Sequence, residues 1–185
     1  SLRNTKSDAS GKKILEAQNK SKINTAEASL VIKGLKEQST IITLKIKNEM
    51  ENFTKENLQK IVSELSEKNN AAVEFKDQEV TIIFSPRKTR TYKNEYNAIK
   101  MSLELNSKLD EMNRKFKEKV EYGIGINSGD IISSLEQNKL KYTAVENTII
   151  VSRKISEMSN QEIIISEKVK NKLLREIRTE KIEKS

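Results

Sequence analysis

The sequence predicts an α+β fold in which two helices pack on one face of an antiparallel sheet. Several short stretches either alternate apolar with polar residues or are rich in β-branched residues, which is typical of strands. Two longer stretches between them repeat an apolar residue every three or four positions, which is typical of amphipathic helices. The resulting order of strand, helix, two strands, helix and strand is the βαββαβ order of a ferredoxin-like unit.

The first strand and the first helix are expected within residues 39–70. The sequence STIITLKI, residues 39–46, is rich in β-branched residues and predicts a central strand. Thr54 is expected to cap a helix that ends at Asn69 and Asn70. One face of this helix carries the apolar residues Leu58, Ile61, Val62 and Leu65.

A hairpin and a long helix are expected next. Two apolar runs, residues 72–75 and 80–84, flank the polar sequence KDQE and predict the hairpin. Pro86 ends it, because proline cannot continue a strand ladder, and residues 87–93 are expected to form a basic loop. The helix is predicted by apolar residues at three- or four-residue spacing: Ala98, Met101, Leu105, Leu109, Met112 and Phe116.

A second hairpin is expected in residues 120–144. Apolar residues alternate with glutamate and glycine over residues 120–126, which predicts a strand with one buried face. The sequence NSGD, residues 127–130, supplies turn residues before Ile131 begins the next strand. A further short strand is expected at residues 141–144.

Two helices and a short strand are expected after this hairpin. Asn147 and Ser166 stand where helix caps would, and residues 163–165, III, form an apolar run of strand length. The apolar residues that mark the helices are Val151, Ile155 and Met158 in the first, and Leu173, Leu174 and Ile177 in the second.

The N-terminal 37 residues are expected to lie outside the main domain, which then spans residues 38–185. Residues 1–13 are polar, basic and Gly/Ser-bearing, which favours a linker or a frayed end. Apolar spacing over residues 14–35, with Gly34 near the end, predicts an amphipathic helix.

The composition excludes several kinds of chemistry. The chain has no Cys and no His, which excludes thiolate catalysis, imidazole acid–base catalysis and zinc sites built from those ligands. Only oxygen ligands remain for a metal. No apolar run approaches the roughly 20 residues that a bilayer span needs, so no membrane insertion is expected. The polar chain, which opens without a leader sequence, predicts a cytoplasmic location.

The positive charge does not by itself indicate a nucleic-acid partner. The formal net charge is +8, from 35 Lys and Arg against 27 Asp and Glu. The basic residues are interspersed with acidic ones, as in KFKEKVE, which is typical of solvated helix faces. RNA-recognition motifs share the βαββαβ order, but their Lys/Arg-Gly-Phe/Tyr pattern does not occur here. Nucleic acid is therefore not expected to bind.

Three motifs resemble a known family. YGIGINSGDII, KYTAVENTIIVSRKI and QEIIISEKV are similar, in order and spacing, to the GIxxGxV, YTxxGDxVNxxxRL and ILIS-type patterns of class III adenylate/guanylate (nucleotidyl) cyclase catalytic domains. The resemblance extends from about Gln38 to the end of the chain, and it implies the elaborated ferredoxin-like core of that family. It also implies a dimer, because the family's active sites form between two subunits. The N-terminal helix would then transmit the state of an upstream sensor, or it would merely pack on the domain.

The resemblance implies a metal site whose ligands are missing. Family members hold two divalent cations with two carboxylates, one at the end of the first strand and one in the first hairpin turn. Alignment sets Lys45 and Gln78 at these two metal positions, and residues 48–50, Asn-Glu-Met, in place of a phosphate-cradling turn. No metal and no cofactor are therefore expected. Asp77 and Glu79, on either side of Gln78, are the residues that could rescue metal binding.

The nucleotide-binding positions of the family are also altered. Ile150 and Lys154 stand in the places of an Asn and an Arg that orient the ribose and stabilise charge on the transferring phosphorus. Lys154 could contact phosphate as a point charge, but it lacks the guanidinium fork. Glu74 and Thr143 stand at the purine-reading positions, where a residual purine pocket could persist. A glutamate there resembles guanine-selective members, and an exposed strand residue is the alternative.

These departures favour a degenerate, catalytically inactive cyclase-homology domain that acts as a dimerising signalling or regulatory module. A homodimer is the expected assembly, and a heterodimer with another cyclase-like chain is the alternative. Two other hypotheses stay open: an atypical active cyclase that recruits Asp77 or Glu79 to metal and Lys154 to phosphate, and a purine-nucleotide sensor without turnover. The sequence does not identify an upstream sensor.

Overall fold

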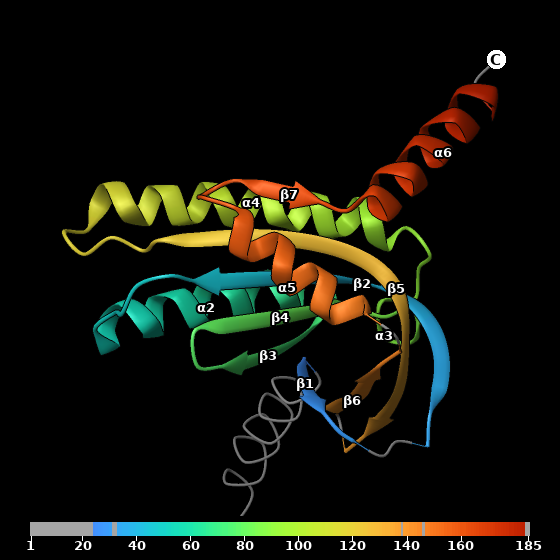
Figure 1. The fold of residues 1–185 in the computed structure, drawn as a ribbon, viewed down its shortest axis with the longest axis horizontal. Helices are drawn as coiled ribbons and strands as arrows, with labels where there is room; N and C mark the ends of the chain where they lie inside the picture. Colours follow the sequence, from blue (N-terminus) through green and yellow to red (C-terminus); the bar gives the residue numbers. More distant parts are fainter. Residues whose placement is uncertain (1–23, 31–32, 138, 146, 184–185) are drawn as a thin grey trace, which may run out of the picture.

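The structure, a computed structural model, describes residues 24–30, 33–137, 139–145 and 147–183 (Figure 1). It confirms the α+β fold and the βαββαβ order. Four strands form an antiparallel sheet in the order β3-β4-β2-β5, and helices α2 and α4 cover one of its faces. The elements of this unit are β2 (Leu35–Ile46), α2 (Asn52–Lys68), β3 (Ala72–Lys76), β4 (Glu79–Phe84), α4 (Asn94–Lys115) and β5 (Tyr122–Glu136).

The main hydrophobic core lies between this sheet and helices α2 and α4. Alternate residues of β2, such as Ile42 and Leu44, are fully buried in it, as the period of two in a strand requires. The apolar faces predicted for both helices are confirmed. Their buried members are Leu58, Val62, Leu65, Ala98, Met101, Leu105, Leu109 and Met112, and Ile61 and Phe116 pack against them.

Two predictions at helix ends are wrong. The N-cap of α2 is Glu51, so Thr54 lies inside the helix, where it is buried. The Glu118 carboxylate, which lies outside the helix, accepts a hydrogen bond from the Glu51 backbone N–H at 2.8 Å. This bond holds the backbone at the first residue before the helix. Residues 87–93, predicted as a loop, contain part of the one-turn helix α3 (Pro86–Thr89). Pro86 begins α3 because the fixed φ of proline suits the first helical position.

The turn predicted at NSGD is also wrong, because β5 runs through it without interruption. Ser128 and Gly129 pair with Thr40 and Ser39 of β2. Ser128 is buried and hydrogen-bonds the Glu95 carboxylate at 2.9 Å, so its hydroxyl is satisfied inside the fold instead of in a turn. The chain reverses instead after Glu136, and β5 pairs with β6 (Lys139–Ala144).

Helix α5 (Thr148–Met158) packs on the opposite face of the sheet, against β5 and β2. Its position is confirmed, but its predicted apolar face is only partly right, because Ile155 is buried while Met158 is 66% exposed. The buried face consists mainly of small hydroxyl residues, among them Ser152 and Ser156. They allow the helix backbone to approach Gly123 and Gly125 of β5 closely.

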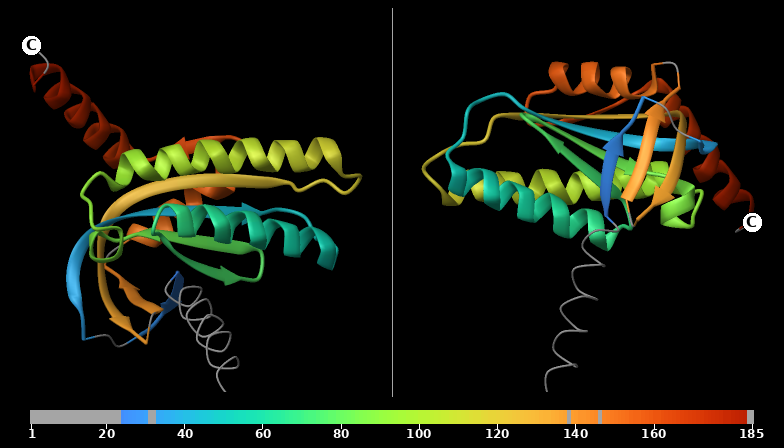
Figure 2. Two further views of the ribbon diagram at one scale, coloured as in Figure 1. Left: turned by 180° about the vertical axis from the view of Figure 1, so that it is seen from behind. Right: turned by 90° about the horizontal axis from the view of Figure 1, so that it is seen from below.

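A short N-terminal strand, β1 (Thr25–Ala28), lies parallel to both β3 and β6 and closes six strands into a ring (Figure 2). The helix predicted over residues 14–35 is therefore wrong where the structure describes it, since β2 also begins at Leu35. Residues 1–23 and 31–32, including the predicted linker, lie outside the described residues. The domain boundary before residue 38 stays a prediction.

A second, smaller core fills the ring of six strands that β1 closes. Its members are Ala26, Ile41, Ala72, Ile83, Ile131, Leu140, Tyr142 and Ile149.

The chain ends on β7 (Ile163–Ile165), which pairs parallel with β5, and α6 (Glu167–Glu183), which points away from the sheet (Figure 1). The predicted cap is confirmed, because the Ser166 hydroxyl accepts a hydrogen bond from the Val169 N–H at 3.3 Å. Lys172 anchors the start of α6 through a 2.8 Å ion pair with the fully buried Glu95 of α4. None of the described helices combines the length and the apolar character needed to cross a bilayer. The cytoplasmic location stays a prediction.

Candidate functional site

Lys45 and Gln78 lie close together at one end of the sheet. Lys45 is opposite Glu79 in the register of β2 with β4. The backbone N–H of Ile46 donates to the Gln78 carbonyl oxygen at 2.8 Å. The Gln78 side-chain amide donates to the carbonyl oxygen of Asn48 at 3.2 Å. The structure therefore brings these two positions together, with an ammonium group at one and an amide at the other.

A cavity of about 440 Å³ opens beside Gln78, between the turn after β2, the start of α2 and the β3–β4 turn. Its lining includes the carboxylates of Glu49 and Asp77 and the ammonium group of Lys55. Asp77 adopts a φ of 52°, in the left-handed region that aspartate tolerates better than most residues. The cavity thus offers two carboxylates, and neither belongs to the two aligned metal positions.

The donor set at Lys45 and Gln78 does not fit a pair of divalent cations. Such cations need oxygen ligands, and Lys45 brings a positive charge instead. The carboxylate of Glu79 is already engaged, because both of its oxygens accept hydrogen bonds from Arg153 Nε, at 2.8 and 2.9 Å. Within the described ranges, no three acidic side chains gather in a group that could hold a metal ion. No catalytic step through a metal follows from these residues.

Arg153 of α5 is a residue of this site that the sequence did not reveal. Its ion pair with Glu79 is partly buried, since the Glu79 side chain is 16% exposed and that of Arg153 is 44% exposed. The two residues are 74 positions apart and belong to no common motif, so no sequence signal could have joined them. The contact ties α5 to β4 and places a guanidinium group one residue before Lys154.

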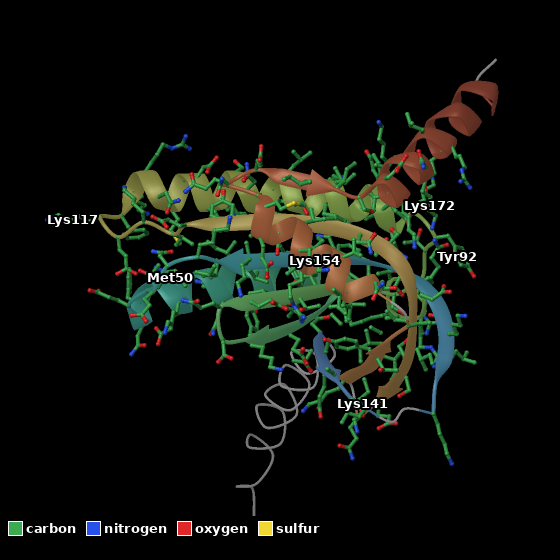
Figure 3. The ribbon with its side chains drawn as sticks, in the orientation of Figure 1. Met50, Tyr92, Lys117, Lys141, Lys154 and Lys172 are labelled. Atoms are coloured by element: carbon green, nitrogen blue, oxygen red, sulfur yellow. The ribbon has the colours of Figure 1, made fainter. Side chains whose placement is uncertain are left out.

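Ile150 and Lys154 lie one helical turn apart on α5 and are both exposed. Figure 3 shows Lys154 on this helix. Ile150 lines a second cavity of about 320 Å³, whereas Lys154 lines neither of the two cavities. Glu74 and Thr143 line the same cavity as Ile150, together with Arg153. The structure therefore gathers Glu74, Thr143 and Ile150, and it places Gln78 in the other cavity.

Both carboxylate oxygens of Glu74 are engaged within the chain. Oε2 accepts a hydrogen bond from the backbone N–H of Ala28 in β1, at 2.8 Å. Oε1 accepts one from the Tyr142 hydroxyl of β6, also at 2.8 Å. Burial, and then the charge of Glu74, raises the pKa of the Tyr142 hydroxyl, so this group stays protonated and acts as the donor. Glu74 is therefore not the exposed strand residue of the alternative interpretation.

The sequence of residues 45–185 matches the family model described as the adenylate and guanylate cyclase catalytic domain. Similar solved structures include the catalytic core of a rhodopsin-guanylyl cyclase with converted specificity in complex with ATPαS. Its TM-score is 0.61 at 16% identity, over 75% of this chain and 83% of that chain. The guanylate cyclase domain of RhGC from Catenaria anguillulae in complex with GTP has a TM-score of 0.59 at 17% identity, over 73% and 81%. The adenylyl cyclase CyaB from P. aeruginosa has a TM-score of 0.56 at 17% identity, over 75% and 81%. No curated protein matches the sequence.

The chain belongs to the adenylate and guanylate cyclase catalytic domain family, because the family model covers most of its length. The solved structures share its fold at low identity. The family resemblance and the fold predicted from the sequence are thus confirmed. The roles assigned to Lys45, Gln78, Glu74, Thr143, Ile150 and Lys154 by alignment stay predictions.

Proposed function

We propose that this chain is a catalytically inactive cyclase-homology domain that works as a dimerising regulatory module. The observation that carries the proposal is that Lys45 and Gln78, which align with the family's two metal positions, lie close together and bring an ammonium group and an amide. Without two cations, nothing would bridge the triphosphate or lower the pKa of the attacking 3′-hydroxyl. Ile150 offers no hydrogen bond to a ribose, and Arg153 is committed to Glu79.

The assembly that we propose is a homodimer. The guanylyl cyclase domain of the RhoGC fusion protein from Blastocladiella emersonii has been solved both as a dimer and as a monomer, so domains of this fold can adopt either state. Sedimentation velocity across a range of concentrations tests this point. A chain that stays monomeric at high concentration would leave a heterodimer with another cyclase-like chain as the regulatory assembly.

The test of inactivity is an assay of the pure chain with ATP and with GTP, each with Mg²⁺ and with Mn²⁺. We expect no cyclic nucleotide above the blank, under conditions in which an active cyclase domain gives product. Metal-dependent product would contradict the proposal and favour an atypical cyclase. Asp77→Ala would then identify the metal ligand, since this substitution should abolish the activity if Asp77 had been recruited.

A purine-nucleotide sensor without turnover is the second candidate, and the cavity lined by Glu74, Thr143 and Ile150 favours it. A carboxylate at this place could accept hydrogen bonds from the N–H groups of a guanine edge. Calorimetry with GTP and with ATP is the direct test. The absence of a binding signal at millimolar nucleotide would count against it.

A further inference from the structure

Strand β1 fills a groove between two strands that would otherwise each present an open edge. It pairs in parallel with β6 over four residues, from Thr25 opposite Lys139 to Ala28 opposite Tyr142. On its other side Thr25 is opposite Val73 of β3, and the Val73 N–H donates to the Asn24 carbonyl oxygen at 2.6 Å. Beyond the strand, the Ser29 N–H donates to the Tyr142 carbonyl oxygen at 2.9 Å. Backbone groups therefore make most of these contacts.

The contact of Ala28 differs from an ordinary strand ladder. Its N–H points toward β3 but donates to the side chain of Glu74, not to a backbone carbonyl. A hydrogen bond to a charged acceptor contributes more free energy than one between neutral groups, so the Glu74 carboxylate is a strong hydrogen-bond acceptor for the strand. At the rim, Lys139 and Glu27 add an ion pair of 3.6 Å between largely exposed side chains.

Apolar side chains contribute little to the docking of β1. Ala26, a small residue, is buried and joins the second core, whereas Glu27 and Ala28 are exposed and Leu30 is 100% exposed. Besides their backbone bonds and the Glu74 carboxylate, residues 24–30 have polar side-chain contacts: Lys88 Nζ donates to Asn24 Oδ1 at 2.7 Å, and Lys139 pairs with Glu27. A strand held in this way, with one buried methyl group, loses little apolar burial when it leaves. Such an element belongs to the part of a structure that opens at low free-energy cost.

We propose that the groove between β3 and β6 is a binding site for an extended peptide strand, filled in cis by residues 24–30. We also propose that this strand and a purine nucleotide exclude each other at Glu74. Ala28 and Tyr142 use both oxygens of Glu74, and Ala28, Ser29 and Leu30 form part of the wall of the cavity beside it. Departure of β1 would free Oε2 and remove part of the cavity wall, so that a base edge could donate to Glu74. This part of the proposal builds on the nucleotide-sensor form of the proposed function, whereas the docking of β1 does not.

Docking in cis can be tested by a disulfide, because the chain has no Cys of its own. Glu27 and Lys141 are Cα partners in the register of β1 with β6, and neither side chain is buried. In the double variant Glu27→Cys/Lys141→Cys, mild oxidation should give an intramolecular disulfide, seen as a monomer on a non-reducing gel and as a linked peptide pair by mass spectrometry. The matched control, Glu27→Cys/Lys60→Cys, has its second Cys on the exposed surface of α2 and should give none. Disulfide-linked dimers only, or no more linkage than in the control, would overturn docking in cis.

Exclusion at Glu74 can be tested in the full chain with Ala28→Pro, which removes the N–H that Glu74 accepts. Ala28→Thr is the matched control, because it keeps the N–H and suits a strand. A fluorescent GTP analogue should bind Ala28→Pro at least about tenfold more tightly than the natural chain or Ala28→Thr, the smallest change expected from losing a hydrogen bond to a charged group. The disulfide-locked variant should bind it most weakly. Equal affinity in all of these proteins, or binding by none, would overturn the exclusion. Cyclic nucleotide formation, in contrast, would contradict only the proposed inactivity.

Discussion

Replacing Gly125 by alanine tests how closely α5 packs on β5, on which the placement of Ile150, Arg153 and Lys154 depends. A Cβ atom at Gly125 would lie 2.4 Å from the backbone oxygen of Ser152 and 2.5 Å from the backbone nitrogen of Ser156. Both atoms belong to the helix backbone, so no side-chain rotation can relieve the overlap and the helix has to move. None of the glycines in the described part of the chain has a positive φ, so alanine brings no backbone strain of its own.

Two effects of opposite sign therefore compete in Gly125→Ala. Alanine restricts the unfolded chain and stabilises the fold by about 0.4–1 kcal/mol. Overpacking against an immobile backbone costs about 1–3 kcal/mol or more. We expect overpacking to prevail, with a net loss of about 1–2 kcal/mol in the free energy of unfolding and a Tm lower by about 2–8 °C. Urea titration and thermal melting followed by circular dichroism measure both quantities.

Gly129 provides the control for this prediction. A Cβ atom there would meet the side chain of Thr148, at 2.5 Å from Oγ1 and 3.0 Å from Cγ2. Thr148→Ala removes both of these atoms, although it also loses the hydrogen bonds of the hydroxyl to Asp130 and Val145. The double variant Gly129→Ala/Thr148→Ala should therefore lose less stability than the two single variants added together. The same Thr148→Ala change should not rescue Gly125→Ala, whose overlap is with backbone. An unchanged Tm in Gly125→Ala would refute the close packing of α5.

Two further predictions concern charged and hydroxyl groups inside the fold. Lys172→Met should lower the free energy of unfolding, measured by urea titration, by about 3 kcal/mol, because it leaves the buried Glu95 carboxylate without its cation. The double variant Lys172→Met/Glu95→Gln should recover most of this loss, because it also removes the buried charge. Tyr142→Phe should cost about 1.5–3 kcal/mol at pH 8, because its hydroxyl donates to the charged Glu74. The pKa of Tyr142 in the folded chain lies above its ordinary value of about 10. The contribution of its hydroxyl to stability is therefore complete below about pH 10, and it is lost as the pH rises from there through the folded pKa. Urea titrations at pH 8 and pH 11 should therefore show a smaller difference between Tyr142→Phe and the natural chain at the higher pH.

Local sequence patterns were sufficient to predict the main unit of the fold. The periodicity of the apolar residues in α2 and α4, and the KDQE turn between two apolar runs, follow from local rules, and the structure confirms them. Strand β1 could not be predicted, because the sequence TAEA has little β-branched character and becomes a strand only by pairing with β3 and β6. The NSGD sequence carries strong turn residues, yet tertiary hydrogen bonds such as that between Ser128 and Glu95 keep it in β5.

The candidate site shows the same division between local and tertiary information. Alignment to family motifs gave Glu74, Thr143 and Ile150, and the structure brings these three positions to one cavity. The partners of these positions could not be inferred, because each contact joins distant segments. Glu74 binds the backbone of Ala28, and Arg153 binds Glu79. Neither contact leaves a periodic or spaced signal in the sequence.

The proposed loss of the metal site is tested most directly by Mn²⁺ binding, measured by electron paramagnetic resonance with a non-cyclisable GTP analogue present. With the natural chain, we expect the Mn²⁺ signal to be the same as that of the nucleotide complex alone. We expect the double variant Lys45→Asp/Gln78→Asp, which places carboxylates at both aligned metal positions, to change this signal. Protein-bound Mn²⁺ in the natural chain that disappears on Asp77→Ala would contradict this account of Lys45 and Gln78.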